Sequence, residues 1–239
     1  MAGAGSLISF PSLVGFGLPS LTANATNFVA LLPGRVSSFL PFRGYLSTVV
    51  PHLKLLMLPT VVGAAAGSWM LVSTSERLFR VVVPFLILGA AVLLAFQPRI
   101  KAWAKRNDRH LGKPSAVALQ FLTSLYGGYF GAGIGIMMLA TFALTVEGSL
   151  NEQNALKIVF ALVISVISSA VVLQGGLVDP WAAGSMLAGG LLGGYYAGRW
   201  MLKMDEDKLR GGIVALGLIL AAYYAVQEFL PGLVGRIGR

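Results

Sequence analysis

The chain has 239 residues, of which 56% are hydrophobic and only 11% are charged. Soluble domains usually carry about 25% charged residues, and several apolar stretches here have the roughly 20 residues that cross a bilayer. No stretch shows a regular polar face, which argues against a soluble helical core and predicts an all-α, polytopic membrane protein in the plasma or inner membrane. The net charge of +9 does not indicate nucleic acid binding, because the basic residues gather in short segments between apolar runs.

The chain contains no cysteine and only two histidines, His52 and His110. This excludes disulfides, thiolate metal sites, iron–sulfur clusters and cysteine nucleophiles. The sequence also offers no nucleophile–base pair, acidic dyad or metal cluster. We therefore expect no cofactor and no enzymatic activity. A membrane enzyme or assembly scaffold is the weakest of the functions considered.

Eight apolar segments follow one another in two sets of four. The first four are expected at 3–17, 22–42, 46–72 and 78–97, and the last four at 114–147, 151–174, 180–202 and 208–230. Between the sets lies a basic segment, 98–113, which contains Arg99, Lys101, Lys105, Arg106, Arg109 and Lys113. The predicted organisation is a first transmembrane repeat at 1–97, a basic cytoplasmic loop at 98–113 and a second transmembrane repeat at 114–239.

The two sets are predicted to be an internal repeat, because Gly, Trp and Asn recur at matching positions. With a shift of 131 residues, Gly63, Gly67 and Trp69 fall on Gly194, Gly198 and Trp200. Nearer the start of each half the shift is 127 to 128 residues. There Gly3 and Gly5 match Gly131 and Gly133, and Asn24 and Asn27 match Asn151 and Asn154. Two homologous four-segment repeats result, with about 7–8 membrane segments. Glycines at i, i+4 such as Gly63 and Gly67 favour close helix packing.

Segment 114–147 is too long for one ordinary span, since a helix of about 34 residues would extend about 50 Å. Glycines interrupt its middle, so we predict a broken helix or a re-entrant hairpin. In the first half only Met1 and Ala2 precede Gly3. The helical arm that precedes the glycines in the second half therefore has no counterpart in the first. We expect either that a late start or trimming removed this arm or that the arm is dispensable. If the first segment of each half turns back without crossing the membrane, the two repeats are inverted, and the charges of the loops favour this arrangement. If each first segment crosses the membrane, the repeats are parallel.

The asparagine pairs, Asn24 with Asn27 and Asn151 with Asn154, are the first candidate site residues. Each pair is expected to begin a helix, and the i, i+3 spacing places both amides on one face. The amides and the helix N-terminus suit an oxyanion, and the two pairs would face each other across a midplane site. The alternative is ordinary helix capping.

Glycines and buried cations complete the candidate site. The turns with Gly3, Gly5, Gly131 and Gly133 either expose backbone N–H groups to a substrate or allow close packing. Lys157 and Arg35 lie inside apolar helices and are candidates for binding an anion, with snorkelling or local pairing as the alternative. Acidic residues are nearly absent from the segments, which leaves Glu147 or Glu152 as the least implausible proton relays.

Several motifs together resemble the TauE/SafE sulfite exporter family, part of the toluene sulfonate uptake permease group. They are Gly3-Ala-Gly-Ser-Leu-Ile-Ser-Phe-Pro11, Gly17-Leu-Pro19, Ala23-Asn-Ala-Thr-Asn27, Tyr129-Phe-Gly-Ala-Gly133, Asn151-Glu-Gln-Asn-Ala-Leu-Lys157 and Gly193-Gly-Tyr-Tyr-Ala-Gly198. The resemblance covers essentially the whole chain, and it implies a transporter of small sulfur-containing anions such as sulfite, sulfoacetate and related organosulfonates.

The leading hypothesis is a secondary transporter or exporter that works by alternating access at a site between the repeats. Its partners would be the small anion, the lipid bilayer, a coupling proton or sodium ion and, through glycine-rich faces, a second copy in a homodimer. The alternative is an anion channel or uniporter with the same site and no coupled ion.

Overall fold

The computed structural model describes residues 5–39, 44–106, 111–189 and 206–229. The described part is helical. Its helices are α1 (Gly5–Gly15), α2 (Ser20–Ala30), α3 (Leu32–Phe39), α4 (Leu46–Ser73), α5 (Glu76–Arg106), α6 (Lys113–Tyr129), α7 (Ile134–Thr145), α8 (Leu150–Gln174) and α10 (Glu206–Phe229). Residues 180–189 are also helical.

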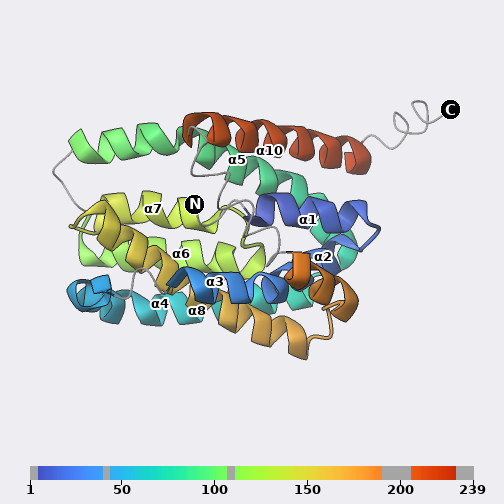
Figure 1. Cartoon of the computed structure of the whole chain (residues 1–239), viewed down its shortest axis with the longest axis horizontal. Helices are drawn as coiled ribbons and strands as arrows, with labels where there is room; N and C mark the ends of the chain where they lie inside the picture. Colours follow the sequence, from blue (N-terminus) through green and yellow to red (C-terminus); the bar gives the residue numbers. More distant parts are fainter. Residues whose placement is uncertain (1–4, 40–43, 107–110, 190–205, 230–239) are drawn as a thin grey trace.

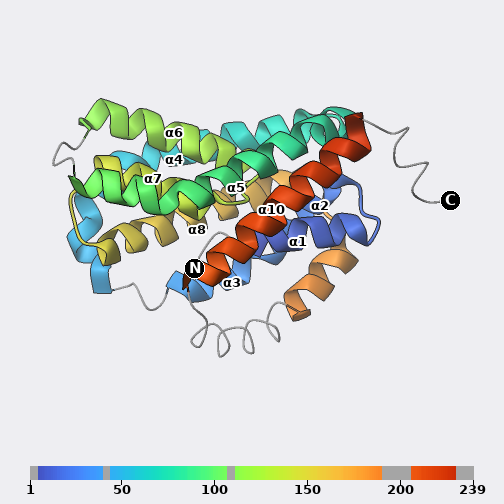
Figure 2. The ribbon, with the colours of Figure 1, turned by 90° about the horizontal axis from the view of Figure 1, so that it is seen from above.

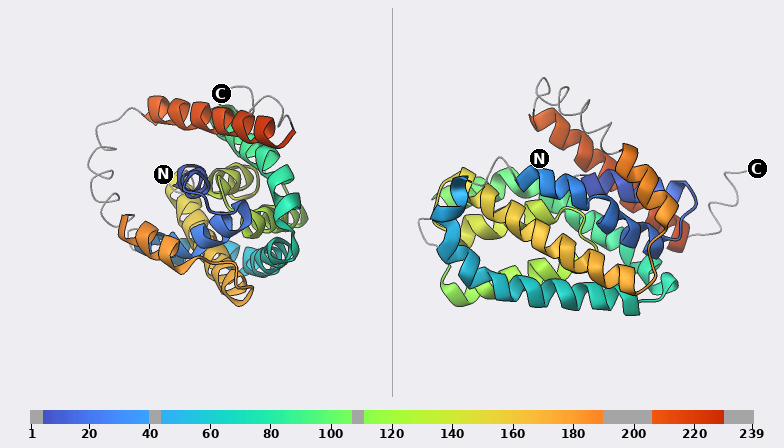
Figure 3. Two further views of the ribbon diagram at one scale, coloured as in Figure 1. Left: turned by 90° about the vertical axis from the view of Figure 1, so that its right-hand side faces the viewer. Right: turned by 60° about the horizontal axis from the view of Figure 1, so that its bottom comes forward.

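The helices form an elongated bundle in which most of them follow the long axis (Figure 1). α10 crosses α5 obliquely and packs against part of it (Figure 2). The view along the bundle places α5 and α10 on one side and α4 and α8 on the other (Figure 3). Three candidate spans, Leu46–Ser73, Glu76–Phe96 and Asn151–Gln174, are long and apolar enough to cross a membrane. The predicted all-helical membrane class is thus supported, while the repeats and the number of membrane segments stay predictions.

The predicted break in segment 114–147 is confirmed. α6 ends at Tyr129 and α7 begins at Ile134. Gly131 and Gly133 in the turn between them both have φ of 75°, a conformation that L-residues with a side chain rarely adopt. The N–H of Leu111, just before α6, donates to the carbonyl of Leu144 near the end of α7 over 2.8 Å. The two arms therefore run antiparallel as a helical hairpin.

Two expected element boundaries are wrong. The segment expected at 22–42 begins at Ser20 and is divided at Leu31 into α2 and α3. The loop expected from residue 98 is helical in its first part, because α5 continues to Arg106. Lys, Arg and Ala are good helix formers, so this basic stretch extends the helix instead of ending it.

The apolar interior consists of two clusters of buried side chains. One joins α1, α2, α5 and α10 and includes Phe10, Phe79 and Phe130. The other joins α4, α6, α7 and α8 and includes Phe142 and Phe160. The glycine turn lies at their boundary, since Phe130 belongs to the first cluster and Ile134, four residues later, to the second.

α4 and α6 are in backbone contact. A Cβ on Gly63 would lie 2.6 Å from the carbonyl oxygen of Phe121, and one on Gly67 would lie 2.1 Å from that of Leu125. The packing interpretation of Gly63 and Gly67 is therefore confirmed. Their counterparts Gly194 and Gly198 lie outside the described residues.

Candidate functional site

The first asparagine pair lies inside α2 and not at its start as expected, because the helix already begins at Ser20. Asn24 is 1% exposed and its Nδ2 donates to the carbonyl of Tyr129 over 3.0 Å. Asn27 is 4% exposed, and its Oδ1 accepts a 2.6 Å hydrogen bond from the Ser9 hydroxyl. The pair is thus buried between α1 and the end of α6.

The N-terminus of α2 is occupied by a carboxylate of the chain itself. Glu76 accepts from the N–H groups of Ser20 and Leu21 over 2.7 and 2.9 Å. The partial positive charge of this helix end, which the sequence had suggested for a substrate anion, is therefore neutralised by Glu76. Thr26 adds a further tether to α2, because its hydroxyl accepts from the N–H of Asp179 over 3.0 Å.

The second asparagine pair lies at the start of α8, as predicted. Ser149 caps this helix in a capping box with Glu152. Asn151 is exposed and donates to the Tyr45 hydroxyl over 3.3 Å. Asn154 Oδ1 accepts a 2.7 Å hydrogen bond from the ammonium of Lys157, which is only 5% exposed.

Arg35 reaches from α3 onto the same helix, α8. One of its terminal nitrogens, Nη1, donates to the carbonyl of Ala161 over 3.2 Å and to the hydroxyl of Ser165. Both acceptors are neutral. Arg35 and Lys157, the two cations singled out in the sequence, thus both lie against α8.

A single row of residues on α8 connects these features. Lys157, Ala161, Ser165 and Ser169 follow one another at intervals of four, so they lie one above another on the helix surface. We call these four residues the α8 polar row. Lys157, Ser165 and Ser169 are at most 5% exposed, so the row is a buried polar stripe on a largely apolar helix.

The structure does not bring the two asparagine pairs together. Ser68 of α4 hydrogen-bonds the carbonyl of Gly128 over 3.3 Å and the hydroxyl of Ser168 over 2.8 Å. The end of α6, where Asn24 binds, is therefore level with Ser168. Asn154 lies 14 residues earlier in α8, a distance of about 21 Å along the axis. The expectation that the pairs face each other is wrong for this structure.

The glycines of the turn are closely packed. A Cβ on Gly131 would lie 2.8 Å from the ring of Phe28, and one on Gly133 would lie 3.0 Å from the Cβ of Ala90. The N–H of Gly131 already donates to the carbonyl of Tyr126 over 3.3 Å. Gly5 begins α1, and Gly3 lies outside the described residues. Contact of these glycines with a substrate stays a prediction.

Sequence reasoning missed Glu76 and the serines of α8. The spacing of Lys157, Ser165 and Ser169 was visible in the sequence as three polar residues on one row of an apolar helix. The partner of Glu76 was not visible, because the N–H groups that it accepts from lie 55 and 56 residues away in sequence.

The comparison with known proteins decides the family. The profile described as sulfite exporter TauE/SafE matches residues 1–224. The chain belongs to this family. A Haemophilus influenzae protein named "Probable membrane transporter protein" is 25% identical over 223 residues, which are 93% of this chain and 87% of that protein. "Probable membrane transporter protein YfcA" of Escherichia coli K12 is 24% identical over 93% of this chain and 82% of its own length.

No solved structure matches the chain. The resemblance noted in the sequence is confirmed, and TauE/SafE membership agrees with the apolar helices in making this a multi-pass membrane protein. The relatives' names describe membrane transporters and not enzymes.

Proposed function

We propose that the chain is a secondary transporter or exporter of small sulfur-containing anions, such as sulfite, sulfoacetate or other organosulfonates. The anion passes along the α8 polar row, between α8 and the helices α2 and α3. The description of the family and the names of the relatives support the transporter class. The residues of the row support an anion as the transported species.

The surroundings of Arg35 carry this proposal. In the described part of the chain its guanidinium donates only through Nη1, to Ala161 and Ser165, and it forms no ion pair. Placing an arginine at the centre of a membrane helix costs about 2.5–3.5 kcal/mol on insertion scales. A guanidinium has five donors in a planar fork that matches the oxygens of an oxyanion. An anion that binds here supplies the countercharge.

Lys157, which belongs to the α8 polar row, provides a second cation. It is one turn from Ala161 and two turns from Ser165, which places it about 6–12 Å along α8 from the two acceptors of Arg35. An anion can therefore pass from one cation to the other. Arg35 holds α3 to α8, and Asn24 holds α2 to the end of α6, through a few hydrogen bonds. These contacts join the two halves, and in the proposed mechanism alternating access exchanges them for others.

A channel or uniporter is the second candidate function. Among the described residues no aspartate or glutamate is buried, and this favours transport without a coupled proton. Flux measured under imposed proton and sodium gradients separates the two candidates. Flux that follows either gradient supports coupling, and flux that ignores both supports the uniporter.

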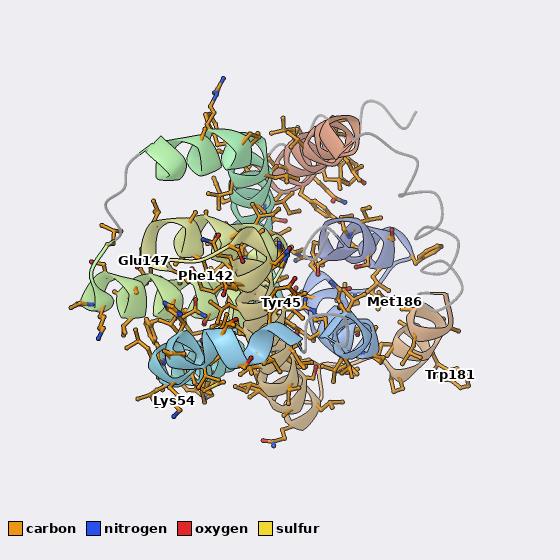
Figure 4. The ribbon with its side chains drawn as sticks, turned by 60° about the vertical axis from the view of Figure 1, so that its left-hand side comes forward. Tyr45, Lys54, Phe142, Glu147, Trp181 and Met186 are labelled. Atoms are coloured by element: carbon orange, nitrogen blue, oxygen red, sulfur yellow. The ribbon has the colours of Figure 1, made fainter. Side chains whose placement is uncertain are left out.

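The central test is uptake of radiolabelled sulfite into liposomes that contain purified protein. Loss of a hydrogen bond to a charged group costs about 1.5–3 kcal/mol, so Arg35→Gln and Lys157→Gln are expected to lower flux by roughly 10- to 100-fold. Lys54→Gln is the matched control, because Lys54 is exposed and points away from the bundle (Figure 4). The site assignment fails if folded Arg35→Gln protein transports sulfite like the wild type.

A further inference from the structure

We infer that Ser169 is a substrate-binding residue, and that it forms an oxyanion site together with Asn27 and Arg35 where α2 and α3 pack on α8. This inference rests on the proposed function and names the residues that would hold the anion. It starts from hydrogen-bond donors that the described part of the protein leaves without an acceptor.

Ser169 has an unusual environment for a buried serine. It is 4% exposed, and its Oγ has no hydrogen-bond partner among the described residues. Serines in helices commonly donate back to the carbonyl four residues earlier. Ser165 does so, to Ala161 over 2.7 Å, and Ser168 is bonded to Ser68. The hydroxyl of Ser169 is thus the buried donor on this stretch of α8 that remains available.

Ser169 is also in the right place for an anion held by Arg35. It follows Ser165 by one turn on the α8 polar row, about 6 Å along the axis. Arg35 binds Ser165 through Nη1, and its Nε and Nη2 donors have no acceptor within the described residues. The hydroxyl of Ser169 therefore lies one turn of α8 from the point where the Arg35 guanidinium contacts this helix.

Asn27 extends this surface from the opposite helix. Two backbone hydrogen bonds connect α2 to α3. The Leu31 N–H donates to the backbone carbonyl of Asn27, and the Arg35 N–H donates to the backbone carbonyl of Leu31, both over 3.2 Å. These two bonds bridge the division at Leu31, and Asn27 and Arg35 stand at its two ends, eight residues apart, at two steps of four residues. The hydrogen bond from Ser9 to Asn27 Oδ1 fixes the amide. Its Nδ2 donates to no acceptor in the described part of the chain.

The hydroxyl of Ser169, the Nδ2 of Asn27 and the guanidinium of Arg35 can all act as donors to a ligand, and the guanidinium carries a positive charge. Such a set favours an anion with several acceptor oxygens. Sulfite and sulfonates present three oxygens in a pyramid, while a carboxylate presents two in a plane. A site with donors on two helices therefore favours the sulfur oxyanion over a carboxylate such as acetate, because the pyramid can direct a separate oxygen at each of the three groups, whereas the planar carboxylate directs its lone pairs within one plane.

The test compares two neighbouring serines on different faces of α8. Ser169→Ala is expected to raise the KM for sulfite about 10-fold, which corresponds to the loss of one hydrogen bond to a charged group. Without ligand its thermal stability should stay unchanged or rise, since the substitution removes an unsatisfied hydroxyl. Ser168→Ala, the control, should lower the stability of the ligand-free protein and leave the KM for sulfite unchanged, because its hydroxyl is bonded to Ser68.

A second measurement is the thermal stabilisation of detergent-purified protein by sulfite and by acetate. Wild type should be stabilised by sulfite in a concentration-dependent way, and Ser169→Ala should need about 10-fold more sulfite for the same shift. If Ser169→Ala binds and transports sulfite like the wild type while Arg35→Gln does not, the inference about Ser169 is wrong and the proposed function stands. If wild-type protein transports no sulfur oxyanion, both are wrong.

Discussion

The contact between α4 and α6 gives a stability prediction that follows directly from its geometry. Gly67 lies so close to α6 that an added Cβ would be 2.1 Å from the carbonyl oxygen of Leu125 and 2.9 Å from the N of Tyr129. Gly128 makes the reciprocal contact, with an added Cβ at 2.3 Å from the carbonyl oxygen of Ala64. Both neighbours are backbone atoms and cannot move aside alone. An alanine at Gly67 must therefore separate the two helices.

The size of this effect follows from the distances. Ordinary van der Waals contact begins at 3.4 Å, so Gly67→Ala requires a separation of roughly 1.3 Å in a densely packed interface. Overpacking of this kind costs about 1–3 kcal/mol. For a chain of this size, that corresponds to a fall of roughly 2–12 °C in the midpoint of thermal unfolding. The assay is unfolding of the purified protein in detergent, followed by tryptophan fluorescence.

Gly89 provides the matched control. It lies within α5, and a Cβ there would meet nothing within 4 Å. Gly89→Ala should leave the midpoint unchanged or raise it slightly, because alanine favours the helix by about 1 kcal/mol over glycine. Equal midpoints for the Gly67→Ala protein and the wild type would refute the claim that α4 and α6 pack through their backbones.

Three further substitutions test local features by the same unfolding assay. Glu76→Ala removes the acceptor of two N–H groups at the start of α2 and should cost about 1.5–3 kcal/mol; an unchanged midpoint would mean that water replaces Glu76 without loss. Gly131→Ala forces a side chain into a φ of 75° and towards Phe28, so a cost of about 1–2 kcal/mol or more is expected; wild-type stability would show that the turn relaxes. Ser149→Ala removes the cap of α8 and should cost about 1 kcal/mol, while no change would show that the cap is dispensable.

The sequence predicted the features that depend on local chemistry. The all-helical class followed from apolar composition, and the break between α6 and α7 followed from glycines in a segment too long for one span. The close approach of Gly63 to α6 followed from the i, i+4 spacing of small residues. Arg35 and Lys157 were found because a charge inside an apolar helix costs free energy wherever it is placed.

The sequence could not predict features that depend on which distant segments meet. Asn24 was expected to begin a helix, but α2 starts earlier, where Glu76 of α5 accepts from its first N–H groups. Ser169 looks like Ser168 in the sequence. Only the packing of α4 on α8 distinguishes them, since it gives Ser168 a partner and leaves Ser169 without one.

The offset between the two asparagine pairs bears on the orientation of the predicted repeats. Parallel repeats place equivalent residues at the same depth in the membrane, whereas inverted repeats place them at mirrored depths. Asn24 is level with Ser168, about 21 Å along α8 from Asn154. The connections before the two pairs also lie at opposite ends of the bundle: the α1–α2 loop at one end and the α7–α8 loop at the other (Figure 1). This offset favours the inverted arrangement.

The absence of native cysteine allows a direct test of this orientation. Phe16 is 85% exposed in the α1–α2 loop, and Glu147 is exposed in the α7–α8 loop. Single cysteines from Phe16→Cys and Glu147→Cys should react with a membrane-impermeant maleimide from opposite sides of oriented membrane vesicles, because inverted repeats turn equivalent loops to opposite faces. Labelling of both from the same side would refute the inverted arrangement and leave the parallel one. Labelling after detergent solubilisation confirms that each thiol is reactive, so that a missing signal reports sidedness alone.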